Sequence, residues 1–494
     1  MAQKMKLSPI DRFIGWFSPR AALERVRYRM AFNTMRNWDA GESVRPNDQW
    51  RPLNLTPEET DHQARDVIRA RARDLERNNE IAAAALKTIV RNVVGTGIRP
   101  QAQIHNKKGE IDETLNNRFE DLWEQWTKPG QCDMEGQSSF YDLQQMVLRR
   151  RIVDGEILVM MPLLRGRNEF PLRVQLWEPD YLSDMGRPAS KENEIYGGVE
   201  VDKYGAPVAY HFTVDSGGAT KRVPSWQVIH LFNKFRPRQV RGISEFAATM
   251  TAIKDLGEYM EAELVAARIA ACFTGFVKSE YAGFRQGRNT NTVNSEPIES
   301  MTPGTIEYLM PGEDISFSSP GRPNTDAAQF STAQTRRIAA GLGLSFETLA
   351  RDYSKGSYSS ARQGHLEDRK EFMALQQYLI EHFCQPIWEE FVWQCVYRGL
   401  VEVKDFDTAR DRYTACRWIA PGWAWIDPKK EVEATQIELA NGMTTLATVC
   451  AKQGNDWQEV LEQRQKEEEF AKSLGINLQF VAPQTEESGG EEQE

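Results

Sequence analysis

The sequence is poor in the residue types that build disulfides and zinc sites. Its 494 residues include six cysteines, and the closest two, Cys384 and Cys395, stand 11 positions apart. This spacing fits neither a disulfide framework nor a zinc site and is typical of a chain kept in a reducing cytoplasm. The six histidines form no His-x-x-x-His pair, so we expect no metal ion and no other cofactor. His211 and His230, in strand-like segments, are expected to be structural.

Long apolar runs are also absent. The longest, Ile157 to Leu164, is far shorter than the ~20 residues of a membrane-spanning helix. Residues 1–17 mix charges such as Lys4, Asp11 and Arg12 with apolar side chains, which is not the pattern of a secretory signal. We therefore expect a soluble intracellular protein with no membrane partner.

Positive charge is in deficit. Lys and Arg number 61 against 71 Asp and Glu, a formal net charge of −10, which disfavours a protein that coats DNA by neutralising phosphates. The 40% of hydrophobic and 27% of charged residues are ordinary for globular proteins. At ~150 residues a domain, the length predicts about three domain-sized units or one large body with insertions.

Recognisable catalytic motifs are missing as well. The sequence has no Gly-x-x-x-x-Gly-Lys-Ser/Thr phosphate loop and no Gly-x-Ser-x-Gly nucleophile turn. Gly95-Thr96-Gly97 and Gly341-Leu342-Gly343 lack the third glycine of a dinucleotide loop and are interpreted as helix ends. No spacing singles out a carboxylate pair, so we predict no catalytic residue and no enzyme activity.

The first part of the chain predicts an extended arm over residues 1–55 and then a helix. Thr56-Pro57 has the pattern of a helix start, and the helix is expected to run to about Val94. Arginines recur every four residues along it. We interpret this stripe as a solvated helix face, with contact to nucleic acid or another subunit as the alternative: its members are Arg65, Arg69, Arg73 and Arg77.

Residues 110–240 predict a mixed block. Helices are expected over 112–126 and 138–151, followed by strands over 155–164, 172–177 and 223–232. The alternating segments 198–202 and 208–212 flank Tyr204-Gly205, which is the pattern of a β-hairpin.

The clearest periodicity belongs to a helix predicted over residues 244–272. Apolar and small residues repeat there every 3.5 positions for nearly four heptads. Such a narrow seam needs a partner surface, which is either the core of the same chain or an identical neighbour. The seam runs through Phe246, Met250, Ile253, Gly257, Met260, Leu264, Ala267 and Ala271, and Asp255, Glu258 and Glu261 fall off it.

The rest of the chain predicts a turn-rich excursion between helices and a helical end. Residues 278–303 are polar, a second helix covers 326–341, and a loop of small and hydroxyl residues follows at 351–360. A long helix over 361–398 is expected to kink at Pro386. The terminal helices begin at 427, with breaks at Asn441-Gly442 and Gly454-Asn455. Residues 483–494 are predicted to be disordered.

Several segments resemble the lambda-type tailed-phage portal proteins, in the right order from about residue 20 to 475. They are 228–232 with 236–244, 338–343 followed by 352–354 and 358–362, 425–428, and 196–200. None is diagnostic alone, but together they are specific.

The resemblance implies a helix-rich α+β portal fold that assembles as a ring, usually of twelve subunits. It implies these parts: an N-terminal arm (1–55), a wing (56–240), a stem helix (241–272), a clip (273–325), a second stem helix (326–344), a tunnel loop (345–360), a long kinked helix with wing strands (361–426), a crown (427–480) and a disordered acidic tail (481–494).

The same resemblance implies a channel for double-stranded DNA at one capsid vertex of the virion, assembled in the host cytoplasm. Implied partners are identical subunits, the terminase large subunit, the head–tail adaptor, and the major capsid and scaffolding proteins. DNA-channel candidates are Asp255, Glu258, Glu261, Arg351 and Lys355. Subunit-packing candidates are Phe246, Met250, Ile253, Met260 and Leu264. The alternatives are a nuclease or another structural protein of the virion.

Overall fold

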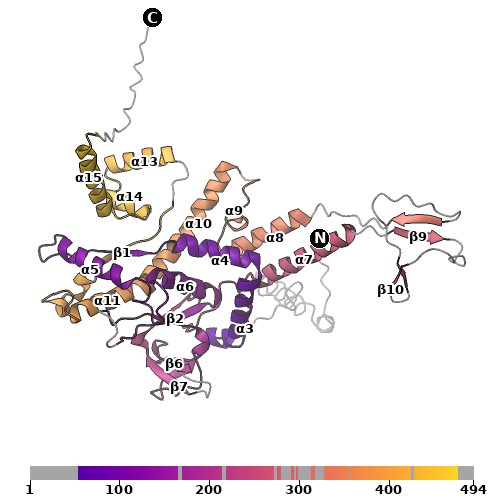
Figure 1. Ribbon diagram of the computed structural model, residues 1–494. Coiled ribbons are helices and arrows are strands. Elements are labelled where there is room, and N and C mark those ends of the chain that lie inside the picture. Colours follow the sequence, from indigo (N-terminus) through magenta and orange to yellow (C-terminus); the bar gives the residue numbers. More distant parts are fainter. Residues whose placement is uncertain are drawn as a thin grey trace, which may run out of the picture. The chain divides into compact units, whose positions relative to one another are not determined.

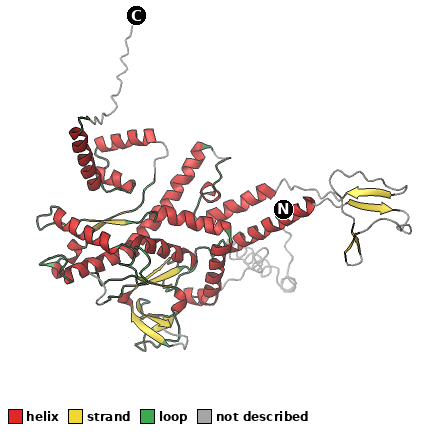
Figure 2. Ribbon diagram, in the orientation of Figure 1, coloured by secondary structure: helices red, strands yellow, loops and turns green. Residues whose placement is uncertain are grey.

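The computed structural model describes residues 54–164, 170–213, 219–271, 275–279, 291–293, 296–298, 313–317, 327–354, 357–423 and 428–476. The chain divides into two units, residues 1–59 and 60–494. Helices predominate and every strand pairing is antiparallel in the described part (Figure 2). The predicted helix-rich α+β class is confirmed. Nearly all of the predicted arm and the whole predicted tail lie outside the described residues.

The helix predicted from Thr56 to Val94 is two helices. Helix α3 spans Pro57–Asn78 and α4 spans Glu80–Val93. Asn79 separates them because its side-chain oxygen accepts the backbone N–H groups of Ile81 and Ala82, which caps the start of α4. Thr56 caps α3 as predicted, and its backbone N–H donates to Glu59 Oε2 over 2.9 Å.

Helices α5 (Glu113–Trp126) and α6 (Phe140–Val153) begin at side-chain caps, Asp112 and Ser139. Their apolar faces enter an aromatic core shared with a later helix. The ring centroids of Trp123 and Phe391 lie 5.1 Å apart in an edge-on arrangement. This core anchors the body of the protein, by which we mean residues 60–256 and 338–423.

Two small sheets complete the central part of the body. The first has the order β3-β2-β8, with β2 at Glu156–Met160, β3 at Gln175–Trp177 and β8 at Val228–Phe232. The second has the order β4-β5-β6-β7 (Glu194–Tyr196, Val199–Val201, Pro207–Thr213, Thr220–Pro224).

The structure confirms the predicted hairpin, whereas the strand predicted over 223–232 is wrong. Strands β5 and β6 pair across the Tyr204-Gly205 turn, and Gly205 takes a φ of +84° there. The single strand expected over 223–232 is interrupted by the 3₁₀ turn η3 (Ser225–Gln227). Another 3₁₀ turn, η2, spans Pro179–Tyr181.

Helix α7 spans Met250–Ala271 and α8 spans Ala327–Gly341 (Figure 1). The predicted start of α7 at Ser244 is wrong, because residues 244–249 form hydrogen-bonded turns before the helix. Between α7 and α8 the chain forms the pair β9 (Gly275–Ser279) with β12 (Glu313–Phe317), and the hairpin β10 (Asn291–Val293) with β11 (Glu296–Ile298).

The long helix predicted over 361–398 contains a wider, π-helical turn. Helix α10 spans Tyr358–Leu379, a π-helical turn η4 covers Ile380–Cys384, and α11 follows at Gln385–Tyr397. Pro386 lies in the first turn of α11, where its missing N–H costs little. The expected interruption near Pro386 is therefore present and takes the form of a π turn.

The remaining elements close the body and lead into the terminal helices. They are η5 (Phe406–Thr408), α12 (Arg410–Tyr413) and β13 (Cys416–Ile419), which pairs with β1 (Arg99–Ala102). Helices α13 (Pro428–Ala440), α14 (Leu446–Lys452) and α15 (Trp457–Ser473) follow. Gly442 and Gly454, at the two predicted breaks, take φ values of +70° and +80°. Among the described residues, no helix has the length and apolar character needed to cross a membrane.

Candidate functional site

Helices α7 and α8 pack against each other. The rings of Tyr259 and Phe330 lie 4.9 Å apart. At the end of α8, a Cβ added to Gly341 would lie 2.4 Å from Thr249 Cγ2, so only glycine permits this approach of the two segments. The pair is therefore fixed to the body at its base.

The apolar seam of α7 changes surroundings along the helix. Phe246, Met250 and Ile253 are 1%, 8% and 0% exposed and belong to the core of the chain itself. Their prediction as subunit-packing residues is wrong, because a side chain already covered by its own chain offers no surface to a neighbour. Met260 and Leu264 are 45% and 52% exposed, so these two candidates stay available for such a contact.

The acidic channel candidates all lie on the exposed side of α7. Asp255, Glu258 and Glu261 are exposed. Glu258 pairs with Lys254 across 3.1 Å, one helical turn earlier, which offsets its charge locally. Asp255 and Glu261 have no ion-pair partner within the described part of the chain. The structure thus leaves two uncompensated carboxylates on this helix.

The predicted tunnel loop 345–360 is partly helical, which corrects the sequence interpretation. Helix α9 spans Phe346–Ala350 and begins at Ser345, whose hydroxyl accepts the N–H of Thr348. Arg351 ends it in the left-handed conformation, with a φ of 54°. The loop proper is therefore residues 351–357, and Lys355 within it lies outside the described residues.

Asp368 of α10 anchors this corner. Its carboxylate, 4% exposed, accepts the backbone N–H of Ser345 over 2.7 Å, the Ser345 hydroxyl over 2.7 Å and the Thr348 hydroxyl over 2.5 Å. A buried carboxylate with three donors is well satisfied and fixes its partners. Helix α9, and with it the start of the loop at Arg351, is therefore held by α10.

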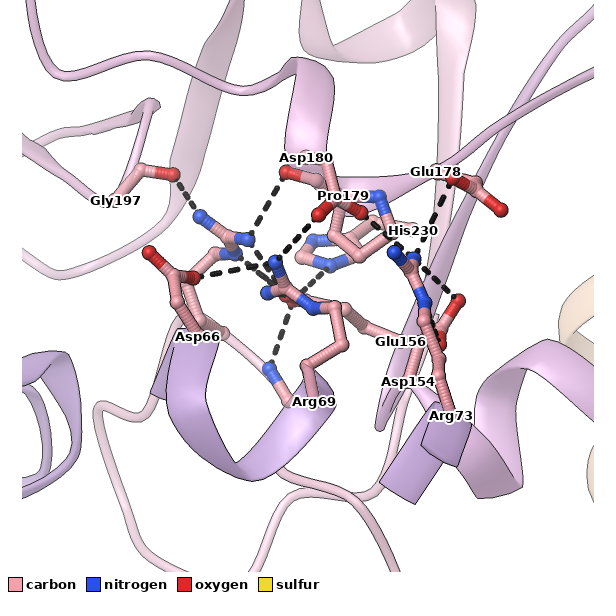
Figure 3. A network of polar contacts seen from close by, with 12 residues as sticks. Asp66, Arg69, Arg73, Asp154, Glu156, Glu178, Pro179, Asp180, Gly197 and His230 are labelled. Carbon is pink, nitrogen blue, oxygen red and sulfur yellow. Dashed lines mark hydrogen bonds and ion pairs between the residues drawn. The ribbon is translucent and has the colours of Figure 1, made fainter. Parts of the chain in front are cut away.

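A buried ionic network centres on Glu156, the first residue of β2 (Figure 3). Its side chain is fully buried, and Arg241 Nη2 donates to it over 2.6 Å and Arg69 Nη2 over 3.3 Å. His230 Nε2 lies 3.0 Å away, and the N–H of Gly242 donates over 2.8 Å. Burial alone would raise the pKa of Glu156, but Arg241 and His230 outweigh it and hold that pKa well below its ordinary value.

The same network corrects the interpretation of the arginine stripe. Arg65 and Arg69 are each 3% exposed, so this part of the stripe is not solvated. Arg73 binds Asp154 over 2.7 Å and Asp180 over 2.7 Å, and its hydrogen bond to Asp154 is the main reason that its pKa is raised. Arg69 therefore holds α3 onto β2, and Arg73 holds it onto the residues that flank the sheet, whereas Arg77 is exposed, as the stripe was expected to be. A glutamate that opens an otherwise apolar strand, Glu156-Ile-Leu-Val-Met, was the sequence signal for this arrangement.

Both strand histidines have structural partners, as expected. His230 contacts Glu156, and burial lowers the pKa of His230. His211 Nε2 lies 3.1 Å from Glu200, which also accepts Arg222 Nε over 2.7 Å. Within the ranges that the structure describes, no group of three or more His, Cys, Asp or Glu side chains is arranged to hold a metal ion.

Comparison with known proteins decides the family. The sequence profile described as "Phage portal protein, lambda family" matches residues 43–376. The chain belongs to the lambda family of phage portal proteins. The resemblance seen in the sequence is thereby confirmed. Proteins of this portal family are structural rather than enzymatic.

Relatives of this portal protein carry matching names. It is 27% identical over 425 residues to the probable portal protein of Halomonas phage phiHAP-1, covering 83% of this chain and 82% of the relative. It is 24% identical over 463 residues to portal protein B of Escherichia phage lambda, covering 85% and 86%.

Solved structures similar to this portal protein include the neck of a native GTA particle computed with C12 symmetry. That chain has a TM-score of 0.43 and 14% identity, with 77% of this chain and 91% of that one covered. An HK97 family phage portal protein from Corynebacterium diphtheriae has a TM-score of 0.30 and 10% identity, with 69% and 93% covered.

Proposed function

We propose that this portal protein assembles as a ring of twelve identical subunits at one capsid vertex, and that double-stranded DNA passes through its channel during packaging and ejection. The observation that supports assembly is the part of α7 from Met260 onward, where Met260, Leu264 and Val265 are 45%, 52% and 45% exposed. Apolar side chains repeated on one helix favour burial against a partner. Their repetition on identical subunits allows a heterologous contact, and such a contact closes into a ring when its rotation closes.

In this proposal the parts keep the roles that the resemblance implied. Helices α7 and α8 form the stem, residues 273–325 form the clip that meets the terminase large subunit and later the head–tail adaptor, and 56–240 with 361–426 form the wing. Residues 427–480 form the crown, and the tunnel loop is narrowed to 351–357. Major capsid and scaffolding proteins surround the ring, which is assembled in the host cytoplasm and retained in the virion.

The charges proposed to face DNA differ between the stem and the loop. Asp255 and Glu261 would repel phosphates and let the duplex slide, whereas Arg351 and Lys355 would give weak contacts without sequence preference. No step of this role requires a bond to be made or broken, so the purified protein is expected to leave DNA intact.

Imaging of the purified full chain by negative-stain electron microscopy tests the proposal. We expect rings for the natural sequence and for Val67→Asp, a control at a similarly exposed apolar residue of α3 (48% exposed). Met260→Asp with Leu264→Asp should give single subunits with an unchanged circular dichroism spectrum. Single subunits for the natural sequence at every salt and protein concentration would overturn the proposal, as would metal-dependent cleavage of plasmid DNA.

A further inference from the structure

Two neighbouring turns of the body carry a concentration of positive charge on this acidic chain. One is the β5–β6 turn, and the other is the loop between β8 and α7. Their exposed cationic side chains, which we call the basic platform, are Lys203, Lys234, Arg236 and Arg238. Exposed aromatic side chains accompany them, with Tyr204 77% and Phe235 65% exposed.

A buried glutamine holds the second turn in shape. Gln239 is 3% exposed, and its Oε1 accepts the backbone N–H groups of Phe235 over 2.9 Å and Arg236 over 3.2 Å. Its Nε2 donates to the carbonyl of Arg241 over 2.8 Å. Because Arg241 also binds Glu156, the loop is tied to the ionic network at its base. The cations are therefore displayed from an ordered backbone.

The two turns touch each other. A Cβ added to Gly205 would lie 3.5 Å from Nε of Arg238, so the Arg238 side chain covers the β5–β6 turn. Arg238 takes a φ of 63°, a conformation that is uncommon for residues with a side chain. This contact places the β5–β6 turn beside the loop that carries Lys234 and Arg238.

Three of the four platform cations have no acidic partner among the described residues. Lys203, Lys234 and Arg238 form no ion pair with any described residue. Lys203 instead lies 5.1 Å from the centroid of the Tyr204 ring. Asp202 is the acidic residue of the β5–β6 turn, and its Oδ1 accepts the N–H groups of Tyr204 and Ala206, each over 2.9 Å. The surface thus keeps a net positive charge.

We propose that the basic platform is a second DNA-binding surface, which contacts the phosphates of duplex DNA without sequence preference. Lysine and arginine on surface turns are the usual donors to phosphate oxygens, and tyrosine contributes to such contacts. The platform lies on different elements from Arg351 and Lys355. This proposal rests on the proposed function only in taking duplex DNA as the partner.

The salt dependence of DNA binding tests the platform. The probe is a short blunt duplex of random sequence, titrated with the full chain at several salt concentrations. Each phosphate contact adds about 0.9 to the slope of log K against log salt. The triple variant Lys203→Gln, Lys234→Gln and Arg238→Gln should therefore lower that slope by about 3. The control Arg71→Gln, Lys87→Gln and Lys108→Gln removes three other exposed cations and the same net charge, and it should leave the slope within about 1 of the natural value.

The outcomes separate the alternatives. Equal slopes for both triple variants would show a general charge effect and overturn the platform. If the platform variant keeps the salt dependence of the natural protein but no longer forms rings, the partner of the platform is another protein subunit. This result would also overturn the proposal of a DNA-binding platform. Ring formation is read by electron microscopy on the same samples, so failure of the proposed ring is distinguished from failure of the platform. Thermal unfolding of each variant shows that the fold is retained.

Discussion

The two halves of helix α7 carry the same apolar repeat but meet different surroundings. In the first half, Met250 and Ile253 are 8% and 0% exposed and belong to the core of the body. Further along the helix, Met260 and Leu264 are 45% and 52% exposed and do not belong to that core. A heptad repeat therefore specifies that one face of a helix is apolar, and the fold decides whether that face is covered by its own chain or left for a neighbour.

The body, unlike the exposed part of α7, contains a buried ionic network. The largest predicted loss of stability comes from a substitution in this network. Glu156→Gln should lower the free energy of unfolding by about 3–5 kcal/mol, because it leaves the buried charges of Arg69 and Arg241 without their shared carboxylate. Urea unfolding measures the change. Glu192→Gln, at an exposed glutamate, is the control and should change stability by no more than about 0.5 kcal/mol.

The same variant should alter the pH dependence of stability. The pKa of Glu156 is lower in the folded state than the ~4.3 of an unfolded glutamate. Its contribution is therefore fully present above that value and is lost as the pH falls through the folded pKa. Stability of the natural protein should decrease more steeply on acidification than that of Glu156→Gln. Parallel curves for the two proteins would contradict the role of the ionised carboxylate.

A pair of truncations compares the halves of α7 directly. Ile253→Ala should cost about 2–5 kcal/mol of subunit stability, since it opens a cavity in a packed core. Leu264→Ala should cost no more than about 0.5 kcal/mol in the isolated subunit, because its side chain is already half exposed. Urea unfolding of dilute, unassembled subunits measures both.

Ring assembly should be affected more by Leu264→Ala than by Ile253→Ala. Mass photometry is expected to show weakened rings for Leu264→Ala and intact rings for the folded fraction of Ile253→Ala. Equal stability losses for the two variants would mean that the second half of α7 is covered within its own subunit.

A smaller loss of stability than that of Ile253→Ala is predicted at the corner that carries the loop 351–357. Asp368→Asn keeps one acceptor oxygen and loses the charge that binds Ser345 and Thr348, so we expect a loss of about 1–2 kcal/mol. Trypsin should cleave faster after Arg351 in this variant, while its other cleavage sites stay unchanged. Glu367→Gln, at the exposed neighbouring position of α10, is the matched control. Unchanged cleavage after Arg351 in Asp368→Asn would contradict the anchoring role.

Local signals predicted much of the fold. Helix starts at Thr56 and Asp112 and ends at Gly442 and Gly454 depend on side chains next to each other in the sequence, so they could be predicted, and the start expected at 138 lies one residue before the cap Ser139. The break at Asn79 was missed because the helical pattern continues on both sides of it. Helix α9 was missed because its few apolar residues are too short a segment to show a period.

The candidate site was harder to predict, because its contacts join distant parts of the chain. Arg69 looked solvated beside its acidic neighbours, whereas the partner that buries it, Glu156, lies 87 residues later. The exposed and covered parts of the α7 seam are identical in pattern, so periodicity alone cannot separate them. Family resemblance supplied the function, and the structure determined which of the proposed contacts are physically available.

The position of Glu156 in the sequence has a consequence for synthesis on the ribosome. Arg69 emerges 87 residues before this carboxylate, and Arg241 emerges 85 residues after it. At about 5–20 residues per second, helix α3 waits about 4–17 s for its counter-charge and about as long again for the second arginine. Arg69 is therefore made long before the buried carboxylate that it shares with Arg241, and the ionic network can form only after about half of the polypeptide has been translated.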